Sequence, residues 1–365
     1  MKSLPARPHL EFLKKEAKAL RAQHRQGDAE CCTRLREHDT PFKNMSDSDV
    51  FETRFSINDA QRIIAREYGY SSWATLKRYI ELINLPLYHK VSDRQDYHQT
   101  ITDSYDARSK NYDNSEWHRD IALATVNYVK PEKGQSVLDI ATGTGSIAFY
   151  SAELVGPQGR VVGVDISQGM LDKCQQKIAE SDNKNIEFRY GDGEYLDFPP
   201  NSFDRIYCSN AIFWMSNLQA AMRHWYEMLR PGGWIGFNAS PSSSFFWGHA
   251  TRKALAAVGR EFTCNIPAGD EANAREMLSC AGFSNCQVIS EPNGHFISAE
   301  DAKEPPFIKL ESYAPGQHPH PLEGISDDDM QRAQQAYEAE VDKHATADGV
   351  WHDMTQYYVY GQKRV

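Results

Sequence analysis

An apolar stretch that runs directly into a glycine-rich turn constrains the fold of this chain more than any other feature. Residues 137–145 read Val-Leu-Asp-Ile-Ala-Thr-Gly-Thr-Gly, so a short strand is followed by small residues at 141, 143 and 145. Small residues let the backbone approach a ligand closely, because a Cβ atom at Gly143 or Gly145 would fill that space. The turn alone is weak evidence, since an ordinary turn between a strand and a helix has a similar composition.

Strand and helix patterns alternate around this turn, from about residue 120 onward. Strands are predicted over 136–140, 160–164, 186–190, 203–208, 234–238, 286–290 and 357–361. Helical patterns lie between them, for example over 170–181 and 217–229. Residues 325–342 also predict a helix, with Ser326 as its cap and three aspartates in its first turn. Such alternation is typical of a parallel sheet covered by helices. The predicted fold class is therefore α/β, with a Rossmann-like sheet.

Acidic residues follow two successive strands after the turn. Asp165 ends the second strand, where a carboxylate accepts hydrogen bonds from the ribose hydroxyls of an adenosine. Asp192 follows the third strand, where it can accept from an exocyclic amine. The glycine spacing differs from the dinucleotide fingerprint GxGxxG, because Ala148 stands where the last glycine would be. Together these elements predict a cofactor that contains adenosine.

With these motifs, residues 100–365 resemble the class I S-adenosylmethionine-dependent methyltransferases, most of all the small-molecule enzymes of the ubiquinone and menaquinone type. The resemblance implies S-adenosylmethionine as cofactor and a sheet of order 3-2-1-4-5-7-6, whose last strand, 357–361, is antiparallel. It implies that residues 139–145 hold the methionine end, Asp165 the ribose, and Asp192 with Gly193 the adenine. The cofactor residues expected are Asp139, Ala141, Thr142, Gly143, Gly145, Asp165, Ile166, Asp192, Gly193 and Ser209. Ala141 departs from the family, many of whose members carry glycine there.

Aromatic residues and one amide are the candidates for catalysis. Tyr105 and Tyr112 precede the first strand, and in the family such a segment covers the methionine end of the cofactor. These tyrosines could equally pack the N-terminal helices against the sheet, so this alternative stays open. Asn210 and Trp214 follow the fourth strand, where substrates meet the cofactor in this fold. Ring faces stabilise a sulfonium cation, and no general base stands out beyond His352 in a loop before the last strand.

The chain is expected to hold two domains. Apolar spacing predicts a helical domain over 1–95, with a polar loop over 38–56, and a catalytic domain over 96–365. Segments 241–280 and 294–325 are long enough to build a private substrate pocket above the sheet. A homo-oligomer is compatible with the sequence.

The composition of the chain argues against several kinds of partner. The net charge of −10 argues against a nucleic-acid partner, which usually needs a basic surface. No apolar run is long enough to cross a membrane, and the first fifteen residues are too charged for a signal peptide, so we expect a cytoplasmic protein. Seven cysteines without a Cys-x-x-Cys pair suggest no metal site.

Three functions remain open from the sequence. The first is methyl transfer to a small molecule, such as a quinone-like or natural-product intermediate of secondary metabolism. The second uses the same cofactor in an intramolecular ring closure, forming azetidine-2-carboxylate and releasing methylthioadenosine. The third is a non-catalytic protein that binds the cofactor for regulation. The aromatic segment and the lack of an obvious base also suit the second, whereas the intact Asp139, Asp165 and Asp192 weigh against the third. Methyl transfer is the function predicted.

Overall fold

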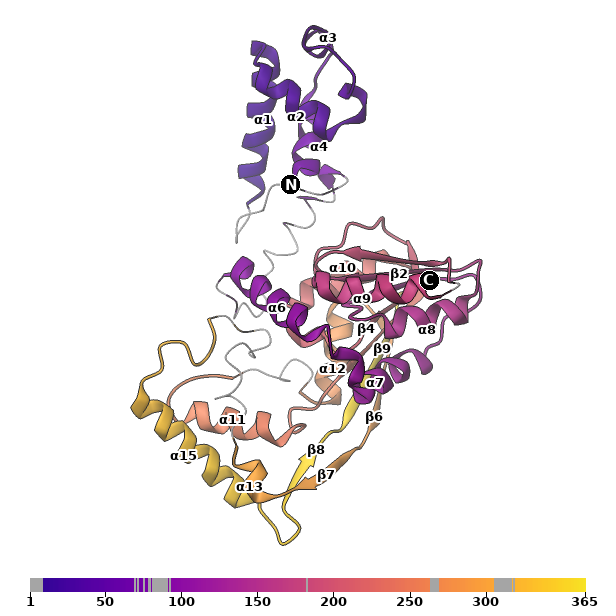
Figure 1. Cartoon of the computed structure of the whole chain (residues 1–365). Helices are drawn as coiled ribbons and strands as arrows, with labels where there is room; N and C mark the ends of the chain where they lie inside the picture. Colours follow the sequence, from indigo (N-terminus) through magenta and orange to yellow (C-terminus); the bar gives the residue numbers. More distant parts are fainter. Residues whose placement is uncertain are drawn as a thin grey trace. The chain divides into compact units, whose positions relative to one another are not determined.

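The computed structural model describes residues 9–68, 70, 72–74, 76–77, 80, 91, 93–181, 183–262, 269–304, 317 and 319–365. The chain divides into two compact units, Met1–Pro86 and Leu87–Val365 (Figure 1). The boundary predicted after residue 95 lies in the first turn of α6 (Arg94–Arg108). None of the helices in the described ranges combines the length and apolar character needed to span a membrane.

The N-terminal unit is helical, as predicted. Its helices are α1 (Leu10–Gln26), α2 (Ala29–His38), α3 (Asp47–Glu52) and α4 (Ile57–Glu67). The apolar faces of α1 and α4 pack together around residues such as Leu13, Leu20 and Ile63. The loop predicted over 38–56 was wrong in part, because Ser46 and Asp49 form a reciprocal cap that starts α3.

The second unit is built on a seven-stranded sheet. Its strands in spatial order are β3 (Ile186–Tyr190), β2 (Arg160–Asp165), β1 (Ser136–Ile140), β4 (Phe203–Cys208), β5 (Leu229–Ala239), β9 (Gln356–Gln362) and β6 (Ser284–Glu291). The first five strands are parallel to one another, whereas β9 is antiparallel to both β5 and β6. This confirms the predicted order, with β9 in the place of the seventh strand.

Helices cover both faces of this sheet because the central strands are apolar on both sides. On one face, Val137 and Val161 pack with residues of α7 (Glu116–Asn127) and α8 (Ser146–Val155). On the other, Leu138 and Val162 share a core with residues of α10 (Leu218–Met228) and α12 (Glu271–Cys280). Thus α12, which lies in the segment predicted as an insertion over 241–280, is a covering helix of the sheet.

A smaller group of elements follows β5. It comprises α11 (Phe246–Ala256), α13 (Ala299–Ala302), α15 (Asp327–His344) and an antiparallel pair of strands, β7 (Gly294–Ile297) and β8 (Val350–Asp353). Ser326 caps α15 and three aspartates occupy its first turn, as the sequence predicts. The helices α11 and α15 pack along each other around Phe246 and Tyr337 (Figure 1). Residues 263–268, 305–316 and 318 of the two predicted insertions lie outside the described residues.

Candidate active site

The turn after β1 has a backbone conformation that few residues adopt. Ala141, Gly143 and Gly145 all have positive φ angles, of 52°, 55° and 91°. A left-handed conformation costs a residue with a Cβ atom roughly 1–2 kcal/mol, which explains why small residues recur here. The amide of Thr142 donates to the Val164 carbonyl at 2.9 Å and so fixes the turn to the end of β2.

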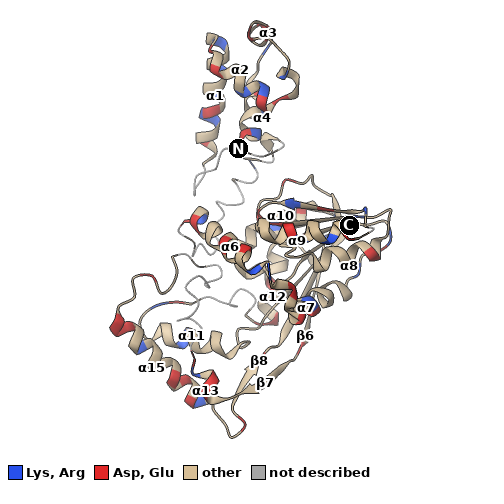
Figure 2. Cartoon of the chain, viewed as in Figure 1, with Lys and Arg blue, Asp and Glu red and all other residues tan. Residues whose placement is uncertain are grey.

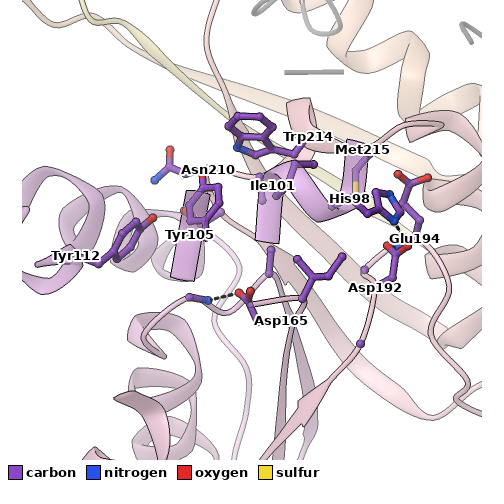
Figure 3. Close-up of a pocket in the computed structure, with 17 residues that line it drawn as sticks. His98, Ile101, Tyr105, Tyr112, Asp165, Asp192, Glu194, Asn210, Trp214 and Met215 are labelled. Carbon is purple, nitrogen blue, oxygen red and sulfur yellow. Dashed lines mark hydrogen bonds and ion pairs between the residues drawn. The ribbon is translucent and has the colours of Figure 1, made fainter. Parts of the chain in front are cut away.

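Two buried carboxylates brace the turn. The Thr142 hydroxyl donates to Asp139 at 2.5 Å, and the Gly143 amide donates to Asp165 Oδ2 at 2.8 Å (Figure 3). Burial raises the pKa of Asp139 to about 7 and that of Asp165 to about 6, because water no longer stabilises the charged forms. The Ser167 amide, which donates to Asp165 Oδ1 at 2.9 Å, opposes this rise.

A cavity opens above this turn at the carboxyl ends of the parallel strands. It holds about 670 Å³ of space, part of it open to solvent. The sequence-predicted residues that line it are Tyr105, Tyr112, Ala141, Gly143, Asp165, Ile166, Asp192, Gly193, Ser209, Asn210 and Trp214. Sequence reasoning missed the other lining residues, which are His98, Ile101, Gly191, Glu194, Ala211 and Met215. The structure therefore gathers residues from four strand ends and from α6 around one cavity (Figure 3).

Three of the expected cofactor residues are not among those that line the cavity. Asp139 and Thr142 are buried behind the turn and shape it. A Cβ atom on Gly145 would lie 2.8 Å from the Phe149 ring, with Phe188 also close. The small size of Gly145 therefore serves the packing of these rings, and its place in the cofactor site stays a prediction. An added Cβ on Gly143 would meet only Tyr112, at 3.6 Å.

The helix α6 is attached to the rest of the site at its C-terminal end. Asp106 accepts hydrogen bonds from the Gly169 amide at 2.9 Å and from the Ser167 hydroxyl. These donors belong to the start of α9 (Gln168–Ala179) and to its N-cap, so one carboxylate joins the two helices. Tyr97 adds a hydrogen bond from its hydroxyl to the Trp214 carbonyl at 2.9 Å.

The N-terminal half of α6 is held by ionic contacts. His98 Nδ1 lies 3.2 Å from Asp192 Oδ2, and Arg94 lies 3.3 Å from Glu194. Glu194 is buried, and it also accepts hydrogen bonds from the backbone and hydroxyl of Ser216. No sequence motif marked these contacts, because α6 and the turn after β3 are about a hundred residues apart in the chain.

The predicted aromatic residues meet at one end of the cavity. The Tyr105 ring lies edge-on to Trp214 at a centroid distance of 5.8 Å and 6.3 Å from Tyr112. Burial raises the pKa of both tyrosines, so their hydroxyls stay protonated near neutral pH. Asp113, next to Tyr112, accepts hydrogen bonds from Thr144 at 2.5 Å and from a lysine of α9, which ties this segment to the glycine turn.

Asn210 is held by a buried amide pair. Its backbone N–H donates to Asn238 Oδ1 at 2.6 Å, and Asn238 Nδ2 donates back to Asn210 Oδ1 at 2.9 Å. Gln356 accepts from the same Asn238 amide group at 3.1 Å. Asn210 has a φ of 53°, which places its side chain at the cavity from the end of β4. Asn238 and Gln356 were not expected, because neither belongs to the glycine motif.

Neither His352, the histidine considered from the sequence, nor His224 is among the residues that line the cavity. His224 makes a 2.6 Å hydrogen bond with the Leu196 carbonyl and has a structural role. His352 lies in β8 opposite His295, and neither is among the residues that line the cavity. His118 is nearer, with its ring 5.0 Å from that of Tyr112. Burial and the charge of Arg108 lower the pKa of His118, which keeps this imidazole neutral at physiological pH.

This chain is similar to several known proteins. A family model described as a methyltransferase domain matches residues 137–233, which include the glycine turn and both acidic strand ends. The demethylmenaquinone methyltransferase of Listeria monocytogenes serotype 4a is 32% identical over 224 residues, covering 56% of this chain and 91% of that protein. Aklanonic acid methyltransferase DauC of Streptomyces sp. (strain C5) is 32% identical over 145 residues, covering 39% of this chain and 66% of that protein. The crystal structure of YcgJ from Bacillus subtilis is similar with a TM-score of 0.45 at 18% identity, covering 68% of this chain and 100% of that one.

Proposed function

Because the chain belongs to the class I S-adenosylmethionine-dependent methyltransferases, we propose that it methylates a small-molecule acceptor in secondary metabolism. The observation that carries the proposal is the cavity above the glycine turn, where acidic strand ends and an aromatic cluster face the same space. Two relatives are named for small acceptors, demethylmenaquinone and aklanonic acid, which supports an acceptor of that size.

The residues around the cavity suit S-adenosylmethionine. We assign the ribose hydroxyls to Asp165, whose carboxylate already accepts two backbone hydrogen bonds and has room for more. We assign the adenine to Asp192 and Gly193, beside the apolar side chains of Ile166 and Met215. The open side of Gly143 leaves space for the methionine end. When bound, the cofactor supplies an activated methyl group on a positively charged sulfur.

The side chains at the aromatic end align the acceptor and exclude water. Ring faces of Tyr105, Tyr112 and Trp214 favour a cation and keep water from competing with the acceptor. The protonated tyrosine hydroxyls can donate hydrogen bonds to a polar group nearby. The Asn210 amide, fixed by Asn238, is suited to orient the acceptor for in-line displacement.

We assign the reaction to residues 96–365 and a wall of the acceptor pocket to the segment that begins α11. A sequence of ring contacts supports this wall, running from Tyr112 through His118 and Trp117 to Phe245. Phe245 has a φ of 58°, a strained value for a bulky residue of the kind that often occurs at ligand sites. Replacing Phe245 by Ala should raise the acceptor KM and leave the cofactor Kd unchanged.

The test of the proposal is the identity of the nucleoside product. The purified chain is incubated with S-adenosylmethionine alone, with demethylmenaquinone and with aklanonic acid, and products are separated by chromatography. S-adenosylhomocysteine formed only with an acceptor supports methyl transfer. Methylthioadenosine formed without an acceptor would replace it with the intramolecular ring closure. Tight cofactor binding without turnover of any of a broad set of acceptors would instead favour a regulatory protein.

A further inference from the structure

A cluster of metal-binding side chains lies between two helices, separate from the cofactor cavity. His249 belongs to α11, and Glu340 and His344 lie one turn apart on α15, on the same face of that helix. One ligand atom from each side chain lies within 4.8 Å of the other two. His249 Nε2 is 2.8 Å from Glu340 Oε1, and His344 Nδ1 is 3.5 Å from the same oxygen.

We propose that His249, Glu340 and His344 bind one divalent transition-metal ion, for which Zn²⁺ is the probe. Imidazole nitrogen and carboxylate oxygen are ligands that Zn²⁺ binds at about 2.0–2.1 Å. Around a tetrahedral ion at that bond length, ligand atoms lie about 3.4 Å apart, so these side chains need to move by about 1 Å. Water would take the fourth position, as in sites with two histidines and one glutamate.

The surroundings favour a cation at this place. The Glu340 side chain is 11% exposed and the two histidines are 32% and 40% exposed, so the carboxylate forms the base of the cluster and the imidazoles its rim. The Phe246 ring lies against both imidazoles, and an apolar backing limits the access of water. The helix α15 carries six carboxylates against Arg332 and Lys343 (Figure 2).

Lys343 is the competitor of the ion. Its ammonium lies 3.3 Å from Glu340 Oε1, but its side chain is 67% exposed and free to swing into water. An exposed ion pair of this kind is worth about 1 kcal/mol or less, so it is displaced at little cost. His344 Nδ1 also lies 2.9 Å from the Glu340 backbone carbonyl, so this nitrogen must give up that hydrogen bond and lose its proton when it binds the ion.

A second cluster in the described part of the chain is unsuited to a metal. His98, Asp192 and Glu194 also bring their ligand atoms within 4.8 Å of one another. The Arg94 guanidinium, only 18% exposed, lies 3.3 Å from Glu194 and 3.8 Å from Asp192. A fixed positive charge there repels a cation, and the Glu194 oxygens already accept several hydrogen bonds, including one from Ser216. His98 is therefore a suitable control residue.

The ion would fasten α11 to α15. These helices otherwise meet through an apolar contact around Phe246, Tyr337 and Val341. A metal that binds only the folded arrangement stabilises it in proportion to its affinity. The ion would thus stiffen the start of the helix that follows Phe245. The proposal is independent of the cofactor assignment, because none of its ligands lines the cavity.

The experiment titrates the chelator-treated full-length chain with Zn²⁺ by calorimetry, without S-adenosylmethionine, and records Tm with and without the ion. We expect one ion per chain and a higher Tm. His249→Ala and His344→Ala should each weaken binding more than about 100-fold, beyond the loss caused by removing an outer hydrogen-bond partner. Lys343→Ala, on the same helix, should bind Zn²⁺ more tightly than the unaltered chain. His98→Ala should bind it equally well.

Several results would overturn the proposal. If the chain does not bind one Zn²⁺ ion, the proposal is refuted directly. Binding that survives both histidine substitutions would place the ion elsewhere, as at adjacent Cys31 and Cys32. Unchanged or weaker Zn²⁺ binding in Lys343→Ala would contradict the competition between this ammonium and the ion, and with it the assignment of the ion to Glu340. Co²⁺ gives a second readout, because its visible absorption is strong in a tetrahedral site. This absorption should be lost in Glu340→Gln, which keeps the size of the side chain even if an alanine variant folds poorly.

Discussion

Replacing Asp165 by Asn should stabilise the protein without cofactor and weaken cofactor binding. Burial raises the pKa of Asp165 from 3.8 to about 6, so the charged form is disfavoured by about 3 kcal/mol in the folded state. Asparagine carries no charge, but only one of its two terminal atoms accepts a hydrogen bond. The Asp165 carboxylate accepts from the amides of both Gly143 and Ser167, so the substitution loses one hydrogen bond, which costs about 1 kcal/mol of stability. Its neutrality also removes repulsion of Asp139. The net gain at pH 7.5 is about 1–2 kcal/mol.

The pH dependence of this gain follows from the direction of the shift. The folded pKa of Asp165 lies above the unfolded value, so its contribution to stability is complete below about pH 4 and is lost as the pH rises through 6. The unaltered chain should therefore lose stability between pH 5 and pH 7.5 relative to Asp165→Asn. The free energy of unfolding of the two proteins, measured by urea denaturation at both pH values, gives this comparison.

The cofactor affinity should change in the opposite direction. Hydrogen bonds to a charged group contribute about 1.5–3 kcal/mol, so loss of the carboxylate should weaken S-adenosylmethionine binding about 10- to 100-fold at pH 7.5. Calorimetry measures this, and Asp192→Asn is the matched control. The Asp192 side chain is 25% exposed, so its substitution should weaken binding without stabilising the protein. Unchanged affinity in Asp165→Asn would refute the ribose assignment, and a less stable variant would refute the account of burial.

Three further substitutions test the rest of the site. Tyr97→Phe removes the hydrogen bond to the Trp214 carbonyl, so we expect a loss of about 1 kcal/mol of stability. We also expect faster cofactor release in stopped-flow measurements. An unchanged release rate would mean that α6 does not restrain the cofactor. Ala141→Gly removes the Cβ atom that makes a φ of 52° unfavourable, so it should raise the free energy of unfolding in urea by up to about 1 kcal/mol. The cofactor Kd should stay the same. A clear loss of stability would contradict the proposed backbone strain. Asp106→Ala removes the carboxylate from the start of α9 and should cost about 1–2 kcal/mol, whereas exposed Asp103→Ala should cost little.

The features predicted correctly from sequence are those with a local cause. The strand over 136–140 was found with its observed bounds because three of its five residues are apolar and a glycine-rich turn follows it directly. The start of α15 was found because Ser326 and the acidic first turn act within a few residues. The positions of Asp165 and Asp192 followed from the same order of elements. The strand order came from the resemblance, since pairing between distant strands leaves no periodic signal in one sequence.

The features that were missed depend on contacts between distant segments. His98 joins Asp192 only because α6 crosses the ends of the parallel strands. Asn238 and Gln356 meet Asn210 because β5 and β9 are neighbours in the sheet. The packing around Gly145 was missed in part for the same reason, because Phe149 is only four residues away but Phe188 comes from β3. Composition could not separate a small residue needed by a ligand from one needed by packing.

The contacts at the two ends of α6 differ in whether they use a side chain that we assign to the cofactor. At its C-terminal end, Asp106 engages the hydroxyl of Ser167, which is buried and whose amide also donates to Asp165. A nucleoside bound at Asp165 leaves these bonds intact. At the N-terminal half, His98 occupies the carboxylate of Asp192, the group assigned to the adenine. An adenine bound at Asp192 would therefore compete with His98, whereas the buried hydroxyl of Tyr97 keeps this half of α6 attached to the Trp214 carbonyl.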